Sequence, residues 1–376
     1  MSASRKRLLV SHGARFGAAL LLTSLGTMAF VRAAEITPHE KQLAAAAKKE
    51  GAVTMINASI SDLTAHDLEK GFKQRYSLGD DFKFNMIRKG TGPTVAQARQ
   101  EILAGKHTID VVLVAAPGFF EAAIEHGALL KLDSDYWKDS EELAKKADQY
   151  FHYPYVVIPN ASSFQPIWNS SCPGMSNFSA NSYSDVVKPE LKGKTIASDI
   201  TKSFTYTNTA LSLQENGALD LEKFWHELKA TDPIVEFRTE PKMQMVISCQ
   251  RPLDMWNLTG RAYQNIVKAP ELAKIIKFGV YKEGQVMFGN QGAVLKDAPH
   301  PNAGQLLLEY MLSKEGTDVV IADEAVYSFR KNYKPPAKAA PYLFDLNTTR
   351  LLGLKDWIAA QKKFKTVREQ WQTVFQ

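Results

Sequence analysis

The chain has 376 residues, of which 45% are hydrophobic and 23% are charged, so it has the composition of an ordinary globular protein with room for two domains or two lobes. Its formal net charge of +6 is spread along the chain and forms no basic arm, which argues against a nucleic-acid-binding protein. The two cysteines are too few for a domain built on a disulfide framework.

The N-terminus has the pattern of a secretory signal peptide. Basic residues precede an apolar segment, residues 16–31, that is interrupted by small residues. Val31 and Ala33 fit the −3 and −1 positions of a signal peptidase site, which predicts cleavage before Ala34. A membrane anchor is the alternative, but the apolar segment is shorter than the ~20 residues that a spanning helix needs. We expect residues 1–33 to be removed on export, leaving a periplasmic mature chain that does not span the membrane.

The first part of the mature chain alternates helices and strands. Thr37 and Glu40 form a capping box with proline at the first helical position, and Gly51 supplies a left-handed stop. The run 109–115 is almost entirely apolar and β-branched, as in a parallel strand buried on both faces. This order is typical of a doubly wound α/β layer. The predicted elements are a helix up to residue 50, strands at 52–56, 81–88 and 109–115, and helices at 63–76, after residue 94 and from residue 117.

The second part of the chain is less regular. The region 150–165 is rich in Tyr and Pro and lacks a helical period, which predicts a connection between lobes. Further strands are expected at 166–169, 194–198, 275–280 and 291–296, a helix at 218–230, and one or two amphipathic helices at 351–375.

A proline-rich turn lies at residues 299–302. Its prolines exclude a continuous helix, so Asn302 is expected to cap the helix that follows and Gly316 to end it. His300 is interpreted as a turn residue, because no partner for a metal or catalytic role is near it in the sequence.

The two cysteines, Cys172 and Cys249, lie in a chain that we expect to enter an oxidising compartment. They could form one disulfide, or they could be two unpaired buried thiols. We favour the disulfide, because free thiols are a liability outside the cytosol.

Several motifs, taken in their order, are similar to those of one family. They are residues 47–51, 110–113, 183–194, 292–316 and 327–330. In these segments the chain resembles the bacterial extracellular solute-binding proteins of the ferric-iron-type group, and the similarity extends over residues 45–336. Members of this family are the binding components of ATP-driven importers. The resemblance implies a two-lobed α/β fold of the type II-like periplasmic-binding-protein class, with the ligand in the cleft between the lobes and hinge closure around it.

The same resemblance implies a domain division and partners. Lobe 1 would comprise residues 34–153 and the part of 280–340 that follows the return crossover, and lobe 2 would comprise residues 166–279. The chain would cross between lobes twice, at residues 154–165 and at about 279–284, and end in a helical tail at 341–376. The partners would be a small-molecule ligand and the permease and ATPase of the inner membrane. No exposed heptad or long apolar edge stands out, so we expect a monomer.

The candidate ligand site follows from the rule that open α/β sheets bind ligands at the carboxyl ends of their strands. The segment Gly90-Thr91-Gly92 also precedes a helix N-terminus, which offers N–H groups to a carboxylate or phosphate, although an ordinary glycine turn explains it equally well. It is neither a dinucleotide fingerprint nor a P-loop. The candidates are Asn57, Ser59, Gly90, Thr91, Gly92 and Ala116 in lobe 1, and Trp168, Asn169, Ser198, Thr205, Tyr206, Trp256 and Asn257 in lobe 2.

The ligand class is inferred from these side chains. Iron-binding members of the family use adjacent tyrosines in the second lobe, whereas this chain has Trp256-Asn257-Leu258 and then a lone Tyr263. Hydroxyl, amide and aromatic groups on a mildly basic chain favour a small polar or anionic organic solute, such as a carboxylate, phosphonate or sugar phosphate. Direct ferric binding is the alternative. We expect no cofactor and no metal ligands.

An enzyme is the competing class. The sequence has no Gly-X-Ser-X-Gly elbow, no His-Glu-X-X-His pair and no Cys/His cluster, so we predict a binding protein. An exported enzyme on a two-lobed α/β fold would have to assemble its site from residues distant in the sequence. A sensor that presents its ligand to a membrane receptor would share the binding fold, and the sequence does not separate it from a transport protein.

Overall fold

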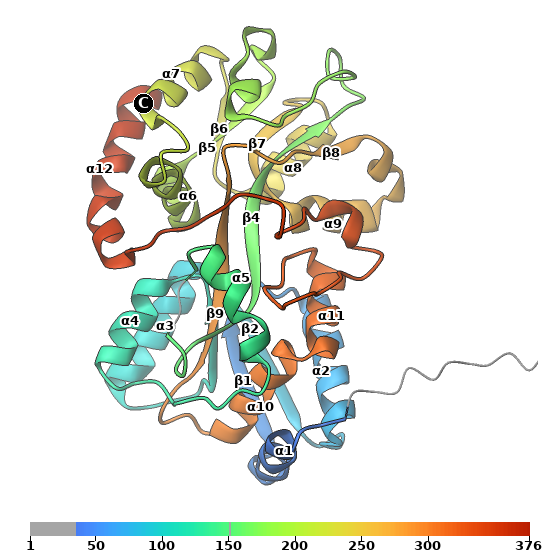
Figure 1. Ribbon diagram of the computed structural model, residues 1–376, viewed down its shortest axis with the longest axis vertical. Coiled ribbons are helices and arrows are strands. Elements are labelled where there is room, and N and C mark those ends of the chain that lie inside the picture. Colours follow the sequence, from blue (N-terminus) through green and yellow to red (C-terminus); the bar gives the residue numbers. More distant parts are fainter. Residues whose placement is uncertain (1–34, 150–151) are drawn as a thin grey trace, which may run out of the picture. The chain divides into compact units, whose positions relative to one another are not determined.

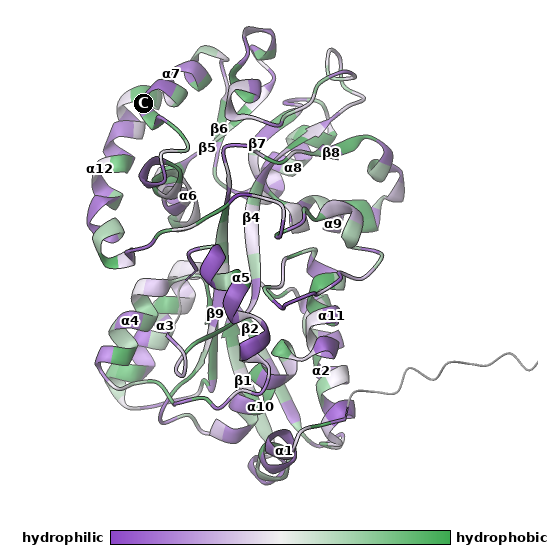
Figure 2. Ribbon diagram, in the orientation of Figure 1, coloured by the Kyte–Doolittle hydropathy of each residue, from purple (hydrophilic) through white to green (hydrophobic). Residues whose placement is uncertain are grey.

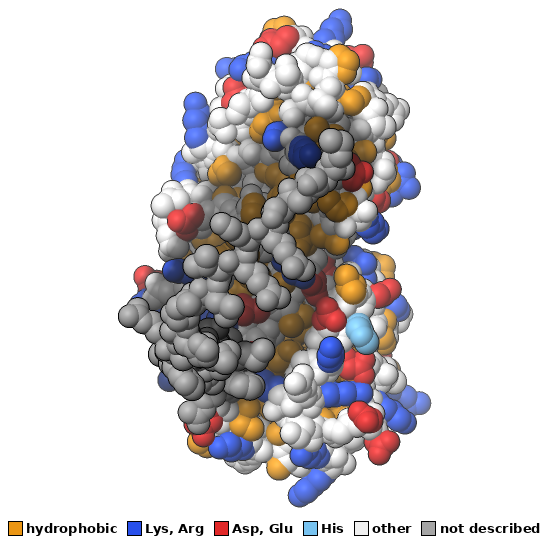
Figure 3. All heavy atoms as spheres, turned by 90° about the vertical axis from the view of Figure 1, so that its right-hand side faces the viewer, with side chains coloured by type: hydrophobic (Ala, Val, Ile, Leu, Met, Phe, Trp, Pro, Cys, Tyr) orange, Lys and Arg blue, Asp and Glu red, His pale blue; other side chains and the backbone are white. Residues whose placement is uncertain are grey.

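The computed structural model describes residues 35–149 and 152–376. The predicted signal peptide, residues 1–33, and its cleavage site lie outside the described residues. Within the described residues, no helix is both long and apolar enough to cross a lipid bilayer. On the face drawn in Figure 3, Lys and Arg side chains are interspersed with Asp and Glu.

Lobe 1 is a layer of parallel strands flanked by helices (Figure 1). β1 pairs in parallel with β2 on one side and with β3 on the other. The capping box is confirmed, since Thr37 accepts from the backbone N–H of Glu40, and Gly51 ends the first helix at φ 73°. The elements are α1 (Pro38–Glu50), β1 (Ala52–Asn57), α2 (Asp62–Tyr76), β2 (Lys83–Arg88), α3 (Thr91–Ala104), β3 (Val111–Val114), α4 (Pro117–Glu125), α5 (Glu141–Lys146), α10 (Pro301–Leu312) and α11 (Lys314–Glu324).

Two long strands, β4 (Val157–Asn169) and β9 (Gln285–Val294), run through both lobes. β9 pairs with β3 of lobe 1 at one end and with β4 along most of its length. β4 then continues into lobe 2, where it pairs antiparallel with β7. One sheet of order β2-β1-β3-β9-β4-β7-β5-β6 results. The segment predicted to connect the lobes thus forms most of β4, which was not recognised as a strand because it is buried along almost its whole length and shows no alternation of polar and apolar residues.

Lobe 2 repeats the α/β pattern. β5 pairs in parallel with β6 and β7. Cys172 and Cys249 are joined by a disulfide, with 5.5 Å between their Cα atoms. The elements are β5 (Thr195–Ser198), α6 (Phe204–Glu215), α7 (Leu221–Ala230), β6 (Ile234–Glu236), α8 (Thr239–Ile247), β7 (Leu253–Leu258), α9 (Thr259–Lys268) and β8 (Ile276–Phe278), with short 3-10 turns such as Tyr183–Val187.

The C-terminal segment returns to lobe 2. β10 (Leu351–Leu352) pairs with β9, and α12 (Trp357–Phe375) packs against α6 and α7 of lobe 2 and touches α4 of lobe 1. The chain thus crosses between lobes a third time, where the family resemblance implied two crossings. α12 stays in place because Trp357, Phe364 and Trp371 are buried on one of its faces. Unlike α12, the short helix α5 has few apolar side chains, and Figure 2 colours it mostly purple, the colour of hydrophilic residues, in agreement with its sequence EELAKK.

The proline-rich turn differs from the expectation in two ways. Asn302 does not cap α10, because the helix begins at Pro301 and the Asn302 backbone and side chain both donate to Glu50 Oε1. Gly316 does not end that helix but lies in the first turn of α11, where its N–H donates to the side chain of Ser313. His300 does have a partner, since its Nδ1 lies 3.0 Å from Asp110 Oδ2, and this contact ties the turn to the start of β3.

Candidate ligand-binding site

A pocket of about 260 Å³ lies between the lobes at the carboxyl ends of their parallel strands. β1, β2 and β3 bring lobe 1 residues to it, and the segments after β6 and β7 bring lobe 2 residues. β4 and β9, the two strands that run through both lobes, form the side of the pocket nearest the connection between the lobes. Its lining includes Ala58, Ser59, Arg88, Thr91, Ala115, Ser162, Ser163, Phe164, Ser203, Thr205, Tyr206, Phe237, Thr239, Leu258, Thr259, Gly260, Arg261, Gln264, Phe288, Asn290, Glu324, Val326 and Tyr327.

Four helices begin at this pocket: α3 from lobe 1 and α6, α8 and α9 from lobe 2. The N-terminus of α6 is capped by Ser203, which accepts from the N–H of Tyr206. Among the described residues, no side chain caps the N-termini of α3, α8 or α9. Each helix N-terminus carries roughly half a positive charge and unpaired N–H groups. These ends therefore favour a negatively charged group in the pocket.

The charged side chains of the lining add to this effect. They are Arg88 at the end of β2, Arg261 in the first turn of α9, and Glu324 at the end of α11. Arg261 contacts Glu240 at 3.3 Å and donates to the side chain of Gln264 at 3.0 Å. Arg88 is exposed and has no ion-pair partner among residues 35–149 and 152–376. The lining thus holds a guanidinium group that is available to a ligand.

Glu324 joins the lobes at the edge of the pocket. Its buried carboxylate accepts from the backbone N–H of Ser61 at 2.7 Å and from the hydroxyl of Thr64 at 2.5 Å, both at the start of α2. Its second oxygen accepts from Gln264 of lobe 2 at 2.8 Å. Because the α2 N-terminus and these three donors already stabilise its charge, Glu324 repels an anionic ligand less than a free carboxylate would.

A buried ion pair lies behind the pocket. Lys242 Nζ donates to Asp254 at 3.0 Å, to Ser198 at 2.8 Å and to the carbonyl of Trp256, and it lies 4.8 Å from the ring centroid of Tyr206. Burial lowers the pKa of Lys242, but Asp254 and Tyr206 together raise it by more, so the ammonium group stays charged. The pair fixes the start of β7 against α8 and supports Tyr206 from behind.

The predicted site residues fall into three sets. Ser59, Thr91, Thr205 and Tyr206 line the pocket. A second set lies next to the lining and shapes it: the Asn57 side chain accepts from the N–H groups of Ser59 and Ile60, and the Ala116 N–H donates to Gln291. Gly90 and Gly92 belong to this set as the cap position and first turn of α3, as do Ser198, Trp256 and Asn257 behind α8.

The third set, Trp168 and Asn169, lies outside the pocket lining. β4 runs antiparallel to β7, with Phe164 opposite Leu258 and Trp168 opposite Leu253. The end of β7 reaches the pocket, so the end of β4 points away from it. Asn169 instead donates to carbonyls at the end of α8 and lies 3.8 Å from the sulfur of Cys249.

Several lining residues were missed by the sequence analysis. Arg88 ends β2, so the strand-end rule could have selected it. Phe164 and Phe288 could not be predicted from the sequence, because they lie in β4 and β9, which were not recognised as continuous strands. No sequence pattern marked Glu324 as a lining residue, since its partners Ser61 and Gln264 are far from it in the sequence.

Comparison with known proteins identifies the fold. No family model and no curated protein matches the chain. Among solved structures, iron-bound HitA from Pseudomonas aeruginosa is similar at 16% identity and a TM-score of 0.65, over 86% of this chain and 99% of that one. AfuA from Actinobacillus pleuropneumoniae with fructose-6-phosphate bound is similar at 17% and 0.65, over 86% and 98%. The substrate-binding protein of an ABC transporter from Agrobacterium tumefaciens is similar at 14% and 0.65, over 85% and 95%. The chain therefore has the two-lobed α/β fold of the periplasmic binding proteins.

The side chains that could contact the ligand bear on whether that ligand is iron or an organic anion. In the described part of the chain, no group of three or more His, Cys, Asp or Glu side chains is placed to hold a metal ion. Tyr206 and Tyr327 line the pocket, but burial raises the pKa of both phenols, and their hydroxyls donate to Trp256 O and Gln165 Oε1. Ferric iron prefers ionised oxygen ligands, so it would have to displace these hydrogen bonds before either tyrosine could bind it.

Proposed function

We propose that this protein is the periplasmic substrate-binding component of an ABC importer, and that it captures a small anionic organic solute. The observation that carries the proposal is the convergence of three uncapped helix N-termini and two arginines on one pocket between two lobes. The ligand would close the lobes by contacting both at once. The closed form would then deliver it to an inner-membrane permease driven by an ATPase.

The fold comparisons support the general class, since the similar structures are binding proteins, not enzymes. We accordingly propose binding without catalysis, by a monomer exported to the periplasm with the help of residues 1–33. Of the similar structures, HitA holds iron and AfuA holds fructose-6-phosphate. The donor chemistry of this pocket supports the organic anion over ferric iron.

A thermal-melting screen of the mature chain from Ala34 tests the proposal. The panel holds small carboxylates, phosphonates, sugar phosphates and ferric citrate. A ligand at a hundredfold excess over its dissociation constant stabilises the folded state by about 2.7 kcal/mol, which raises the melting midpoint by several degrees. We expect a saturable shift with an organic anion. A shift with ferric citrate alone would overturn the proposal.

The variant Arg88→Gln tests whether this arginine binds the anion. A hydrogen bond to a charged group contributes about 1.5–3 kcal/mol, so the variant should bind the organic anion roughly ten- to a hundredfold more weakly. Arg99→Gln is the control, because Arg99 is also an exposed arginine of lobe 1 but lies outside the pocket lining. Equal affinity of both variants would exclude Arg88 from the site.

A further inference from the structure

Three aromatic rings form one wall of the pocket, which we call the aromatic wall: Phe164 of β4, Tyr206 of α6 and Phe288 of β9. The centroid of Phe164 lies 4.4 Å from that of Tyr206 and 4.9 Å from that of Phe288. All three side chains are buried and hold one another in place. The wall therefore presents a fixed apolar surface to whatever occupies the pocket.

Four polar side chains of the lining already have hydrogen-bond partners within the protein. The hydroxyl of Tyr206 donates to Trp256 O at 3.3 Å, and that of Tyr327 donates to Gln165 at 3.0 Å. The Ser163 hydroxyl donates to Val286 O at 2.9 Å, and the Asn290 amide donates to Asn160 at 2.6 Å. A ligand rich in hydroxyl groups would find these donors occupied and would lose hydrogen bonds to water on entering.

A fourth aromatic ring lies at the pocket and is partly exposed. Phe237, just after β6, lines the pocket and is 37% exposed. A large apolar side chain left in contact with water at a binding site gains free energy when an apolar group covers it. This observation is independent of the aromatic wall and also points to a ligand with an apolar body.

The volume of the pocket limits the size of the apolar part of the ligand. Sites for drug-sized ligands occupy about 300–1,000 Å³. This pocket measures about 260 Å³, so it suits a ligand built on one ring.

We propose, building on the proposed function, that the solute is a small aromatic anion: a single flat ring bearing a carboxylate or phosphate group. Its ring contacts the aromatic wall and Phe237. Its anionic group takes donors that remain, among them Arg88, the hydroxyl of Ser59 and the first-turn N–H groups of α3, α8 and α9. This assignment separates the ligand from a polyol phosphate, which offers the same anion without the ring.

Matched pairs of probes test the proposal by isothermal titration of the mature chain. Benzoate is paired with cyclohexanecarboxylate, and phenyl phosphate with fructose-6-phosphate and with inorganic phosphate. We expect at least one aromatic member to bind at least tenfold more tightly than its partners. The two pairs also show whether the carboxylate or the phosphate is the preferred anionic group.

Substitution of the ring tests the role of the wall. Phe288→Leu keeps an apolar side chain but removes the ring, and it should reduce the preference for the aromatic probe about two- to tenfold. Phe237→Leu changes a partly exposed residue and should act in the same direction without a risk to folding. Phe178→Leu is the control, because Phe178 packs on Trp168 outside the pocket lining and should leave the preference unchanged.

The outcomes separate this inference from the function on which it rests. If fructose-6-phosphate or another non-aromatic anion binds as tightly as the aromatic probes, or if only such an anion binds, the aromatic assignment is wrong and the anion-binding function stands. If ferric citrate alone binds, both are wrong.

Discussion

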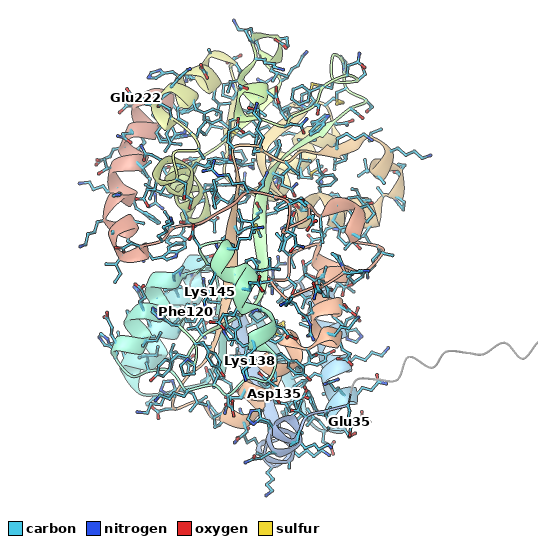
Figure 4. All side chains as sticks on the ribbon, viewed as in Figure 1. Glu35, Phe120, Asp135, Lys138, Lys145 and Glu222 are labelled. Carbon is cyan, nitrogen blue, oxygen red and sulfur yellow. A yellow bond between two sulfur atoms is a disulfide. The ribbon has the colours of Figure 1, made fainter. Side chains whose placement is uncertain are left out.

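At the scale of single residues, Glu309 makes stability depend on pH. This glutamate of α10 lies in lobe 1, and its side chain accepts from the N–H of Asp135, which Figure 4 labels, at 3.0 Å. Burial raises the pKa of Glu309 from the ordinary 4.5 to about 7; the neighbouring carboxylates of Asp135 and Glu40 also raise it, while hydrogen bonds from Ser134 and from the Asp135 N–H oppose the rise. The native protein therefore keeps a proton that the unfolded chain releases between these two pH values.

The sign of the effect follows from this difference in proton binding. The contribution of Glu309 to stability is fully present below about pH 4.5 and is lost as the pH rises through about 7. At 1.36 kcal/mol per pH unit, the loss amounts to about 3 kcal/mol. Urea unfolding at pH 5 and at pH 8.5 measures it.

Glu309→Gln should remove that part of the pH dependence, because the amide keeps its shape and does not ionise. Glu142→Gln is the control, since the side chain of Glu142 is 80% exposed and only contacts Lys331 at 3.6 Å. If Glu309→Gln and the parent protein lose the same stability between the two pH values, the buried carboxyl is not the cause.

At the scale of elements, the contact between α9 and α11 connects the lobes beside the pocket. The hydroxyl of Tyr263 donates to Ala322 O at 2.8 Å. A Cβ atom at Gly260 would lie 2.2 Å from the backbone oxygen of Glu324, a distance that real Cβ contacts do not reach. The observed approach of the two helices therefore requires glycine at this position.

Gly260→Ala should hold the lobes apart and weaken ligand binding, because a ligand that contacts both lobes loses its fit when they separate. Small-angle scattering with saturating ligand should give a larger radius of gyration than for the parent protein. Val267→Ala is the control: Val267 also lies in α9, but it is 56% exposed and outside the pocket lining. Equal affinity and equal radius for the two variants would exclude a closing role for α9 and α11.

The elements also show how far the sequence could predict the fold. Lobe 1 was predicted well, because its helices are capped locally and β3 is a compact apolar run between turns. β4 and β9 were not recognised as long strands, because the burial of both their faces is set by neighbours that lie far away in the sequence. The break between α10 and α11 depends on the Ser313 side chain capping a new helix, which competes with the stop predicted at Gly316.

The candidate pocket could be predicted only as far as the ends of strands determine its lining. Ser59, Thr91, Thr205 and Tyr206 follow strands or begin helices, and they line the pocket. The position of Asn169 outside the lining could not be foreseen, because the direction of β4 relative to β7 is a property of the whole sheet. The same holds for the aromatic wall, whose rings meet only after β4 and β9 pair.

At the scale of the whole molecule, the disulfide that stabilises lobe 2 and the pocket that binds the ligand lie at opposite ends of that lobe. The disulfide between Cys172 and Cys249 closes a loop of 77 residues and lies beside Asn169, at the end of β4 remote from the pocket. A cross-link of this span restricts the unfolded chain, and its loss costs about 2–5 kcal/mol. None of the described pocket residues lies between Asn169 and Ser198.

The variant with both Cys172→Ser and Cys249→Ser should therefore unfold at lower urea concentration while binding its ligand as tightly as the parent protein at 25 °C. Both cysteines are replaced so that no free thiol remains to form other links. The parent protein in a reducing agent should match the variant, and the variant itself should not respond to that agent. A loss of affinity beyond about twofold in the folded variant would mean that the far end of β4 is coupled to the pocket, because the strand that carries Asn169 also carries Phe164 of the aromatic wall.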